Sequence, residues 1–172
     1  RELDILKKKN IIDSETVVHL RRGAGAYICG EESAMIESIE GKRGLPRHKP
    51  PFISKVGLFG QPTLNHNIET VFWVRDIIEN GARWYSDQGT NNRLGPHSYS
   101  VSGRVKNPGV KLAPAGITMN QLLNDYCGGM QKGHKFYGYL PGGASGGLLP
   151  SSMADIPLDF GTLEEHGCFI GS

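Results

Sequence analysis

A glycine-rich loop between a short β-branched run and an amphipathic helix is the feature that most restricts how this chain can fold. Residues 16–20, TVVHL, are short and β-branched, which predicts a strand. Apolar residues recur at helical spacing over residues 31–40, and Gly41 can end that helix. Residues 16–41 therefore predict a strand, a glycine loop and a helix, which is a building unit of α/β folds.

The glycine loop, residues 23–30, is similar to two phosphate-binding motifs and matches neither. The dinucleotide fingerprint requires glycine where Ile28 stands, and the P-loop requires lysine where Glu31 stands. The carboxylates of Glu31 and Glu32 repel phosphate, but they accept hydrogen bonds from hydroxyl and amide groups such as those of a ribose or a nicotinamide. The alternative is that they only complement the dipole of the helix. The three glycines in front favour a ligand site, because a structural helix start rarely needs them.

A basic, proline-rich loop follows at residues 42–52, KRGLPRHKPPF. One interpretation is a cationic rim for an anionic cofactor, with Phe52 as a flat stacking surface. The other is a solvated loop that its prolines stiffen. Composition alone favours the solvated loop.

Polar residues crowd the start of the next predicted helix, residues 67–80. Helix capping explains Asn67 but not the whole polar set at residues 63–70, which suggests a ligand or an unusual loop. His66 by itself is more typical of a structural histidine. The helix is expected to end at Gly81. Its inward face is expected to comprise Ile68, Val71, Phe72, Ile77 and Ile78.

From about residue 98 the pattern changes to short strands separated by turn signals. The capping box of Thr118 and Gln121 predicts the start of a helix. Two strands, a helix and a third strand fit a small β-grasp unit. The glycine-rich segment PGGASGGLLP is either a flexible loop or a surface that a partner or small ligand approaches closely. The expected elements are strands at 99–105 and 110–112, a turn at 107–109, a helix from 118 closed by Gly128 and Gly129, a strand at 136–140 and a loop at 141–150.

The composition excludes several classes of protein. Hydrophobic residues make up 38% and charged residues 21% of the 172 residues, which is enough for a buried core. The net charge of +2 gives no sign of nucleic-acid binding. No apolar run approaches the roughly 20 residues of a membrane span, and the start lacks the apolar region of a signal peptide. The start at Arg1 and the apolar end suggest a fragment of a longer polypeptide.

The three cysteines, Cys29, Cys127 and Cys168, are scattered along the chain. Their odd number and wide spacing argue against a disulfide framework and favour a reducing compartment. The same scatter argues against a metal ion or iron–sulfur cluster held wholly by this chain.

Several of these segments together resemble one family. GAYICGEESA, ESIEGKRG, PPF and the NIET helix start, in this order and spacing, are similar to the NADH-oxidising flavoprotein subunit of respiratory complex I. Relatives of that subunit occur in NAD-dependent formate dehydrogenase and NAD-reducing hydrogenase. The resemblance covers essentially the whole chain. The YLPGGASGG segment and the closing DFGTLEEHGCFIGS look most like the β subunit of formate dehydrogenase.

The resemblance implies an α/β fold in two domains. A Rossmann-like domain that binds FMN and NADH would be present in part over residues 1–97. A small ubiquitin-like β-grasp domain, of the soluble-ligand-binding type, would occupy residues 98–150. Residues 151–172 would lead to a helical bundle, absent from this chain, that binds a [4Fe–4S] cluster. An N-terminal glycine-rich flavin loop would precede residue 1.

The resemblance also implies cofactor contacts. Gly30, Glu31 and Glu32 would line the flavin and nicotinamide site, with Tyr27 in the same segment. Phe52 would stack on the adenine of NADH. Asn67 and Thr70 would lie near the phosphate or ribityl chain of FMN, and His66 stands where the family more commonly has a second asparagine. No catalytic acid or base and no metal ligand is implied.

The function implied is hydride exchange between NADH or NAD and FMN, followed by electron transfer to iron–sulfur clusters. The enzyme class is an NADH dehydrogenase or diaphorase subunit, which the fragment alone is not expected to reproduce. Expected partners are a thioredoxin-like iron–sulfur subunit and a larger iron–sulfur subunit, with no nucleic acid and no direct membrane insertion. The expected location is the cytoplasm, including the inner membrane face as a peripheral part of a complex.

Two alternatives remain open from the sequence. The chain could be a non-catalytic β-grasp ligand-binding or scaffold module, although the GEES segment and the NIET helix start argue against this. It could also be a structural paralogue that keeps the fold without the flavin. Flavin colour in the complete polypeptide distinguishes both from the flavoprotein.

Overall fold

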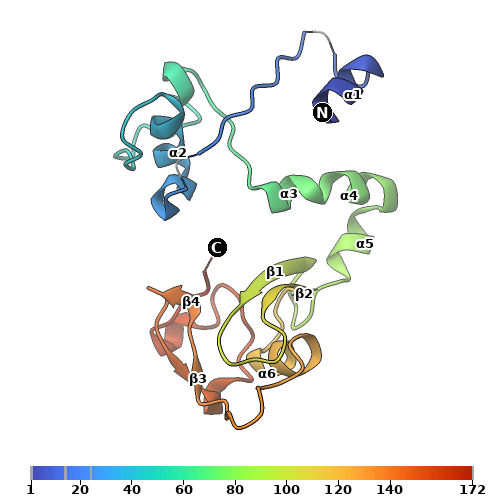
Figure 1. The fold of residues 1–172 in the computed structure, drawn as a ribbon, viewed down its shortest axis with the longest axis vertical. Coiled ribbons are helices and arrows are strands. Elements are labelled where there is room, and N and C mark those ends of the chain that lie inside the picture. The colour runs from blue at the N-terminus through green and yellow to red at the C-terminus, as the bar shows by residue number, and fades with distance from the viewer. Residues whose placement is uncertain (1, 14, 24, 172) are drawn as a thin grey trace. The chain divides into compact units, whose positions relative to one another are not determined.

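The computed structural model describes residues 2–13, 15–23 and 25–171, and its contacts divide the chain into two compact units (Figure 1). The first unit is Arg1–His66 and the second is Asn67–Ser172. Each unit is described by itself below. The predicted domain boundary after residue 97 stays a prediction.

The first unit is helical over the residues that the structure describes. Its elements are the α-helices α1, Glu2–Lys8, and α2, Glu32–Ile39, and the 3₁₀ helices η1, Tyr27–Gly30, and η2, Leu58–Gly60. The strand predicted at residues 16–20 is wrong, because the described part of this unit contains no strand to pair with it. Val17 and Leu20 are largely exposed, as expected for an unpaired extended segment.

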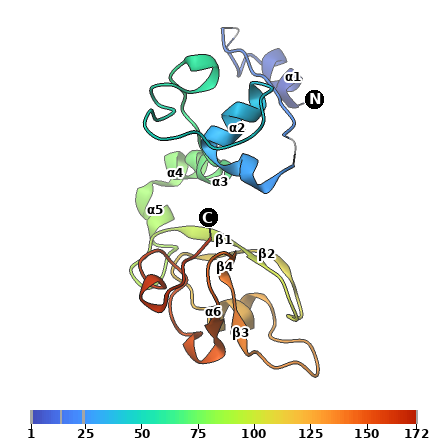
Figure 2. The same cartoon turned by 90° about the vertical axis from the view of Figure 1, so that its left-hand side faces the viewer.

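Helix α2 confirms the helix predicted after the glycine loop. It ends at Ile39, and Gly41 follows with a φ of 79°, a conformation that glycine adopts at low cost. The buried face consists of Ser33, Ala34 and Ile36, whereas Ile39 is exposed. Figure 2 shows the segment after α2 folding back beside the helix.

The predicted helix at residues 67–80 is divided in two. Helix α3 spans Ile68–Phe72 and helix α4 spans Val74–Asn80, with a short helix α5 at Ala82–Ser86 after Gly81. Trp73 lies between α3 and α4 and is the buried residue of this region.

The inward face predicted for residues 67–80 is wrong. Ile68 is 81% exposed and Ile78 is 78% exposed, and Phe72 is also exposed. The side chains that pack are aromatic: the ring centroid of Trp73 lies 6.3 Å from that of Trp84 and 5.7 Å from that of Tyr85. Helical spacing correctly identified a row of apolar residues. In the second unit, however, the described residues do not pack over this row, so most of it is exposed.

A β-hairpin opens the sheet part of the second unit. Strand β1, Pro96–Val101, pairs antiparallel with β2, Gly109–Pro114, so that Pro96 faces Pro114 and Val101 faces Gly109. The predicted first strand therefore starts earlier and ends earlier than residues 99–105. The predicted turn at residues 107–109 lies where the segment between β1 and β2 ends. Its last residue, Gly109, begins β2 with a φ of 117°.

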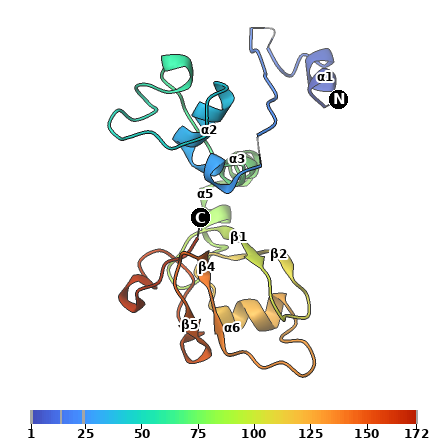
Figure 3. The same ribbon diagram turned by 60° about the vertical axis from the view of Figure 1, so that its left-hand side comes forward.

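Helix α6, Met119–Gln121, continues into a π-helical turn at Leu122–Tyr126. The predicted capping box is confirmed, because the Thr118 hydroxyl accepts from the Gln121 backbone at 3.2 Å and the Gln121 side chain accepts from the Thr118 backbone at 3.0 Å. Figure 3 shows α6 beside the β1–β2 hairpin, and the π-helical turn contacts β2.

The end of the second unit differs from the prediction. The strand expected at residues 136–140 shortens to β3, Gly138–Tyr139, which pairs antiparallel with β5, Leu149–Pro150. The segment expected as a loop at 141–150 contains β4, Pro141–Ala144, as well as β5. The 3₁₀ helices η4, Ser151–Met153, and η5, Glu164–His166, follow.

The main core of the second unit joins the β1–β2 hairpin, helix α6 and the closing segment. The buried residues of this core are Tyr99, Ala113, Ile117, Leu122, Tyr139, Leu149, Ala154, Leu158, Leu163 and Cys168.

No described helix of the chain is long and apolar enough to cross a membrane.

Two neighbouring leucines test this core. Leu149 is 2% exposed and Leu148 is 69% exposed. We expect Leu149→Ala to lower the free energy of unfolding by about 2–5 kcal/mol, because it leaves a cavity. Leu148→Ala is the matched control and should change it by less than about 0.5 kcal/mol. Urea unfolding followed by fluorescence measures both, and equal effects would contradict the assigned core.

Candidate functional site

The Glu31 carboxylate caps helix α2. Its Oε2 atom accepts hydrogen bonds from the backbone N–H groups of Ser33 and Ala34, both at 3.0 Å, and from the Ser33 hydroxyl. These donors are the ones that a helix start otherwise leaves without a partner. The interpretation of Glu31 as a partner of the helix start is therefore correct for this oxygen.

Lys49 joins the two carboxylates of the glycine loop. Its ammonium lies 3.1 Å from Oε1 of Glu31 and 2.6 Å from Oε1 of Glu32. Lys49 belongs to the basic loop, so this contact brings two separately predicted segments into one site. All three side chains are about one-third exposed, which leaves the cluster open to a ligand.

The environment of Glu31 keeps its carboxylate ionised. Partial burial acts to raise its pKa, but the hydrogen bonds from Ser33 and Ala34 and the charge of Lys49 together lower the pKa to about 2. The hydrogen bonds to both carboxylates raise the pKa of the Lys49 ammonium. The cluster therefore carries two negative charges and one positive charge at neutral pH.

Arg47 fixes the basic loop to helix α2. Its guanidinium pairs with Glu37 and, at 3.2 Å, with Glu40, and it donates to the carbonyl oxygens of Val56 at 3.3 Å and Gly57 at 3.2 Å. All of these contacts lie within the first unit. The loop is thus anchored at Arg47, while most of its residues are exposed, in agreement with the solvated loop that composition favoured.

The cations of the basic loop are largely committed to carboxylates. Besides Arg47 and Lys49, Lys42 pairs with Glu40 at 2.7 Å. Because these three cations are paired with carboxylates, they do not form a general cationic rim for an anionic cofactor. Phe52 is 54% exposed, and its ring remains available as a stacking surface.

The glycine loop presents an open backbone surface. A Cβ atom built at Gly23 or at Gly30 would meet no heavy atom within 4 Å. Neither residue has the positive φ that favours glycine, in contrast to Gly25 with a φ of 76°. Packing and backbone conformation therefore do not explain Gly23 and Gly30. Tyr27 lies between them and is almost fully exposed; Ala24 lies outside the described residues.

The residues predicted as cofactor contacts near the start of helix α3 have different surroundings. Asn67 caps α3, since its Oδ1 atom accepts from the Glu69 backbone at 2.8 Å. Thr70 and His66 are exposed, and no side-chain hydrogen bond of either is seen within the described residues. Glu69, which the sequence did not single out, accepts from the Ser98 backbone at 2.8 Å and ties α3 to β1.

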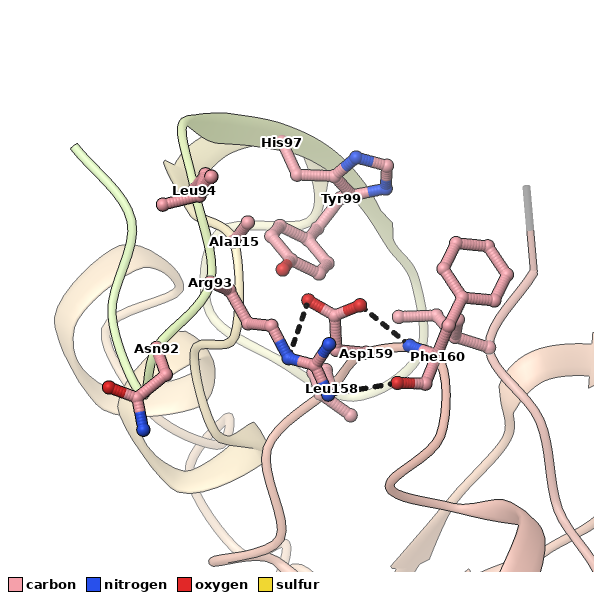
Figure 4. Close-up of a pocket in the computed structure, with 10 residues that line it drawn as sticks. Asn92, Arg93, Leu94, His97, Tyr99, Ala115, Leu158, Asp159 and Phe160 are labelled. Atoms are coloured by element: carbon pink, nitrogen blue, oxygen red, sulfur yellow. Dashed lines mark hydrogen bonds and ion pairs between the residues drawn. The ribbon is translucent and has the colours of Figure 1, made fainter. Parts of the chain in front are cut away.

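A cavity of about 390 Å³ in the second unit was not predicted (Figure 4). Arg93 crosses it, donating to the Phe160 carbonyl at 3.0 Å and lying 3.7 Å from the Asp159 carboxylate. Burial first, and the charge of Asp159 second, raise the pKa of Tyr99 to about 12. The guanidinium and the carboxylate offset each other, so this cavity has no net charge to select a charged ligand.

No group of three or more histidine, cysteine or acidic side chains that could hold a metal ion occurs within the described residues. Cys127 and Cys168 are buried and Cys29 is partly buried; all three are free thiols.

The ionisation of Glu31 makes a testable contribution to stability. Because its pKa in the folded chain, about 2, lies below the ordinary value of 4.5, the contribution is fully present above pH 4.5 and is lost as pH falls towards 2. Solvent screens the partly exposed group, so we expect Glu31→Gln to cost about 1 kcal/mol at pH 7. Unfolding of both proteins at several pH values measures the difference, which should vanish near pH 2; a difference independent of pH would contradict the assignment.

A protein-family model matches the first part of the chain. Residues 2–76 match the family model of the Nuo51 FMN-binding domain. This range contains the glycine loop, the carboxylate pair, the basic loop, Asn67 and Thr70. The segments that the sequence singled out therefore fall within the range that matches a domain type described as FMN-binding.

Similar curated relatives are subunits of NADH-quinone oxidoreductase. The chain is 42% identical to one such subunit of Rhizobium meliloti (strain 1021), over 91% of this chain and 37% of the relative. It is 46% identical to the corresponding subunit of Mycobacterium tuberculosis (strain ATCC 25618 / H37Rv), over 93% of this chain and 35% of the relative. The chain thus spans just over a third of the length of these relatives.

A solved structure is similar as well. The crystal structure of an NAD⁺-reducing [NiFe]-hydrogenase in the H2-reduced state matches with a TM-score of 0.80 and 36% identity, over 94% of this chain and 28% of that chain. This match and the family model confirm the predicted α/β class. The chain is therefore homologous to a subunit of NADH-quinone oxidoreductase, and its residues 2–76 belong to the Nuo51 FMN-binding domain family.

Proposed function

We propose that this chain is part of a flavoprotein subunit that exchanges hydride between NADH or NAD and FMN. The observation that carries the proposal is the open backbone at Gly23 and Gly30 beside the ionised Glu31–Glu32 pair, within a segment that matches an FMN-binding family. The names of the homologous subunits support a multi-subunit oxidoreductase. The electrons would pass to iron–sulfur clusters elsewhere in it.

The residues present fit a flat cofactor. Two glycines whose missing side chains face open space allow a ring system to approach the backbone closely. Bound FMN would supply the hydride-accepting chemistry, and the protein would supply position and electrostatics. A site of this kind needs no acid or base from the chain.

Glu31 and Glu32 have different proposed roles. Glu31 commits one oxygen to the start of α2 and therefore fixes the geometry of the loop. Glu32 contacts Lys49 through Oε1 and is the more exposed of the two, so it is better placed to accept a hydrogen bond from a ribose hydroxyl or a carboxamide. Lys49 offsets part of the negative charge that would otherwise repel the phosphates of NADH.

Exposed side chains supply the remaining proposed contacts. Phe52 would stack on adenine, an interaction that is tolerant of orientation because it uses the ring face. Asn67, Thr70 and His66 would serve the phosphate or ribityl chain of FMN. Tyr27 would border the site because it lies between the open glycines Gly23 and Gly30.

We further propose that the chain works within a longer polypeptide and a larger complex. The homologues are about two and a half times as long as this chain. A helical bundle with a [4Fe–4S] cluster, a thioredoxin-like iron–sulfur subunit and a larger iron–sulfur subunit would receive the electrons. The formate dehydrogenase β subunit remains the proposed subtype, and the second unit the proposed soluble-ligand-binding β-grasp domain.

Flavin content of the complete polypeptide tests the function. We expect FMN to co-purify at about one per polypeptide and NADH to reduce an artificial acceptor such as ferricyanide. A colourless, folded polypeptide without this activity would contradict the proposal. It would instead favour the ligand-binding or scaffold module.

Replacing Glu32 tests the carboxylate directly. Glu32→Gln in the complete polypeptide should raise the KM for NADH several-fold, because a hydrogen bond to a charged acceptor becomes a weaker neutral one. It should also raise the reduction potential of FMN, because reduction adds negative charge that Glu32 disfavours. Steady-state kinetics and redox titration measure the two effects.

Glu165→Gln is the matched control for Glu32→Gln. Glu165 is exposed and lies in a segment without a proposed cofactor contact, so its replacement should change neither quantity. If Glu32→Gln behaves as this control does, the carboxylate serves only the helix start and its pairing with Lys49.

A further inference from the structure

The buried hydroxyl of Ser33 connects the carboxylate pair to the basic loop. Ser33 is 1% exposed, and no other polar residue is buried to this degree within the described residues. Its Oγ atom donates to Oε2 of Glu31 at 2.5 Å and accepts from the backbone N–H of Arg47 at 2.9 Å. One hydroxyl therefore uses its donor at the start of α2 and an acceptor position in a contact with the loop.

The Arg47 contact holds the start of the segment that carries the proposed nicotinamide and adenine contacts. Lys49 follows two residues later and Phe52 five residues later. The other end of the segment is held by Ile53, which is buried and whose carbonyl accepts from the Thr63 backbone at 3.0 Å. Residues 48–52 are thus suspended between two fixed points, and a change at either point changes where Lys49 lies.

Packing on the other side limits how the loop can otherwise be held. A Cβ atom built at Gly44 would lie 2.5 Å from Sγ of Cys29 and 3.4 Å from the carbonyl oxygen of Ala34. The loop therefore passes directly against η1 and α2. The Arg47 guanidinium binds the far end of α2 through Glu37 and Glu40, so it holds the loop even when the Ser33 contact is removed.

We propose that Ser33 is a positioning residue for NADH, which sets the place of Lys49 by holding the Arg47 backbone and the Glu31 carboxylate together. The inference depends on the proposed function of the Glu31–Glu32–Lys49 cluster. Ser33 is buried and touches no substrate itself; it acts through the loop. Without its hydroxyl, the fold persists through the Arg47 guanidinium, but residues 48–52 gain freedom that NADH binding must then remove.

Ser33→Ala in the complete polypeptide is the test. Ser38→Ala is the matched control, because Ser38 lies on the same helix and its hydroxyl has no hydrogen bond within the described residues. We expect Ser33→Ala to raise the KM for NADH roughly ten-fold, because binding must then order the freed side chains of residues 48–52, with kcat within about two-fold. Ser38→Ala should change neither constant.

Hydrogen exchange of the Arg47 amide supplies a readout that does not depend on activity. Exchange of this amide should accelerate in Ser33→Ala and remain slow in Ser38→Ala. A double variant with Lys49→Met separates positioning from general loosening. If Ser33 acts through Lys49, Ser33→Ala should raise the KM much less in the Lys49→Met background than in the wild type.

Three results would overturn the inference. These are an unchanged KM in Ser33→Ala, an unchanged exchange rate at Arg47, and fully additive effects of Ser33→Ala and Lys49→Met. Failure of the proposed function is distinguishable, because a wild-type polypeptide without FMN or NADH oxidation would show it before any variant is made.

Discussion

The hydrogen bonds of the Glu31 carboxylate to the start of helix α2 are the interaction on which the rest of the site depends. They place a negative charge where the helix offers unpaired N–H groups, and this charge in turn holds Lys49. Through Lys49 the basic loop meets the carboxylate pair, and the glycine backbone beside it stays open. A lysine at position 31, as in a P-loop, would remove the helix cap and repel Lys49. This loop therefore does not bind phosphate through a lysine as a P-loop does.

Structural and functional roles coincide in this site and are divided between the oxygens of the carboxylates. Glu31 secures the helix with one oxygen and meets Lys49 with the other, whereas Glu32 is available for a ligand. Such a division explains why two adjacent acidic residues stand here. It also lets the proposed site for an anionic dinucleotide tolerate them, since Lys49 balances part of the charge.

Local signals in the sequence predicted local structure well. The helix after the glycine loop, the Thr118–Gln121 capping box and the end of a helix at Gly81 depend on residues within a few positions of one another. The strand at residues 16–20 and the apolar face of residues 67–80 required partners that the described residues do not supply. The β3–β5 pairing joins residues about ten positions apart across a glycine-rich segment, which pattern alone assigned to a loop.

The candidate site was predicted in its residues but not in its connections. The sequence identified Glu31, Glu32 and the basic loop, yet nothing in the spacing indicated that Lys49 would reach back over 17 and 18 residues, or that Ser33 would hold Arg47. Composition favoured a solvated loop because it cannot show which charges are paired. The acidic residues of α2, Glu37 and Glu40, were the available signal, since carboxylates one turn apart on a helix can bind one arginine.

The central claim is that a flavin lies against the open backbone of the glycine loop. The most direct test is the flavin content of Gly30→Val in the complete polypeptide. A Cβ atom at Gly30 meets no heavy atom within 4 Å, so the variant should fold and melt at the temperature of the flavin-free wild type. The account predicts that it nevertheless loses most of its FMN, because the side chain occupies the space of the cofactor. A folded variant that retains one FMN per polypeptide would contradict the account.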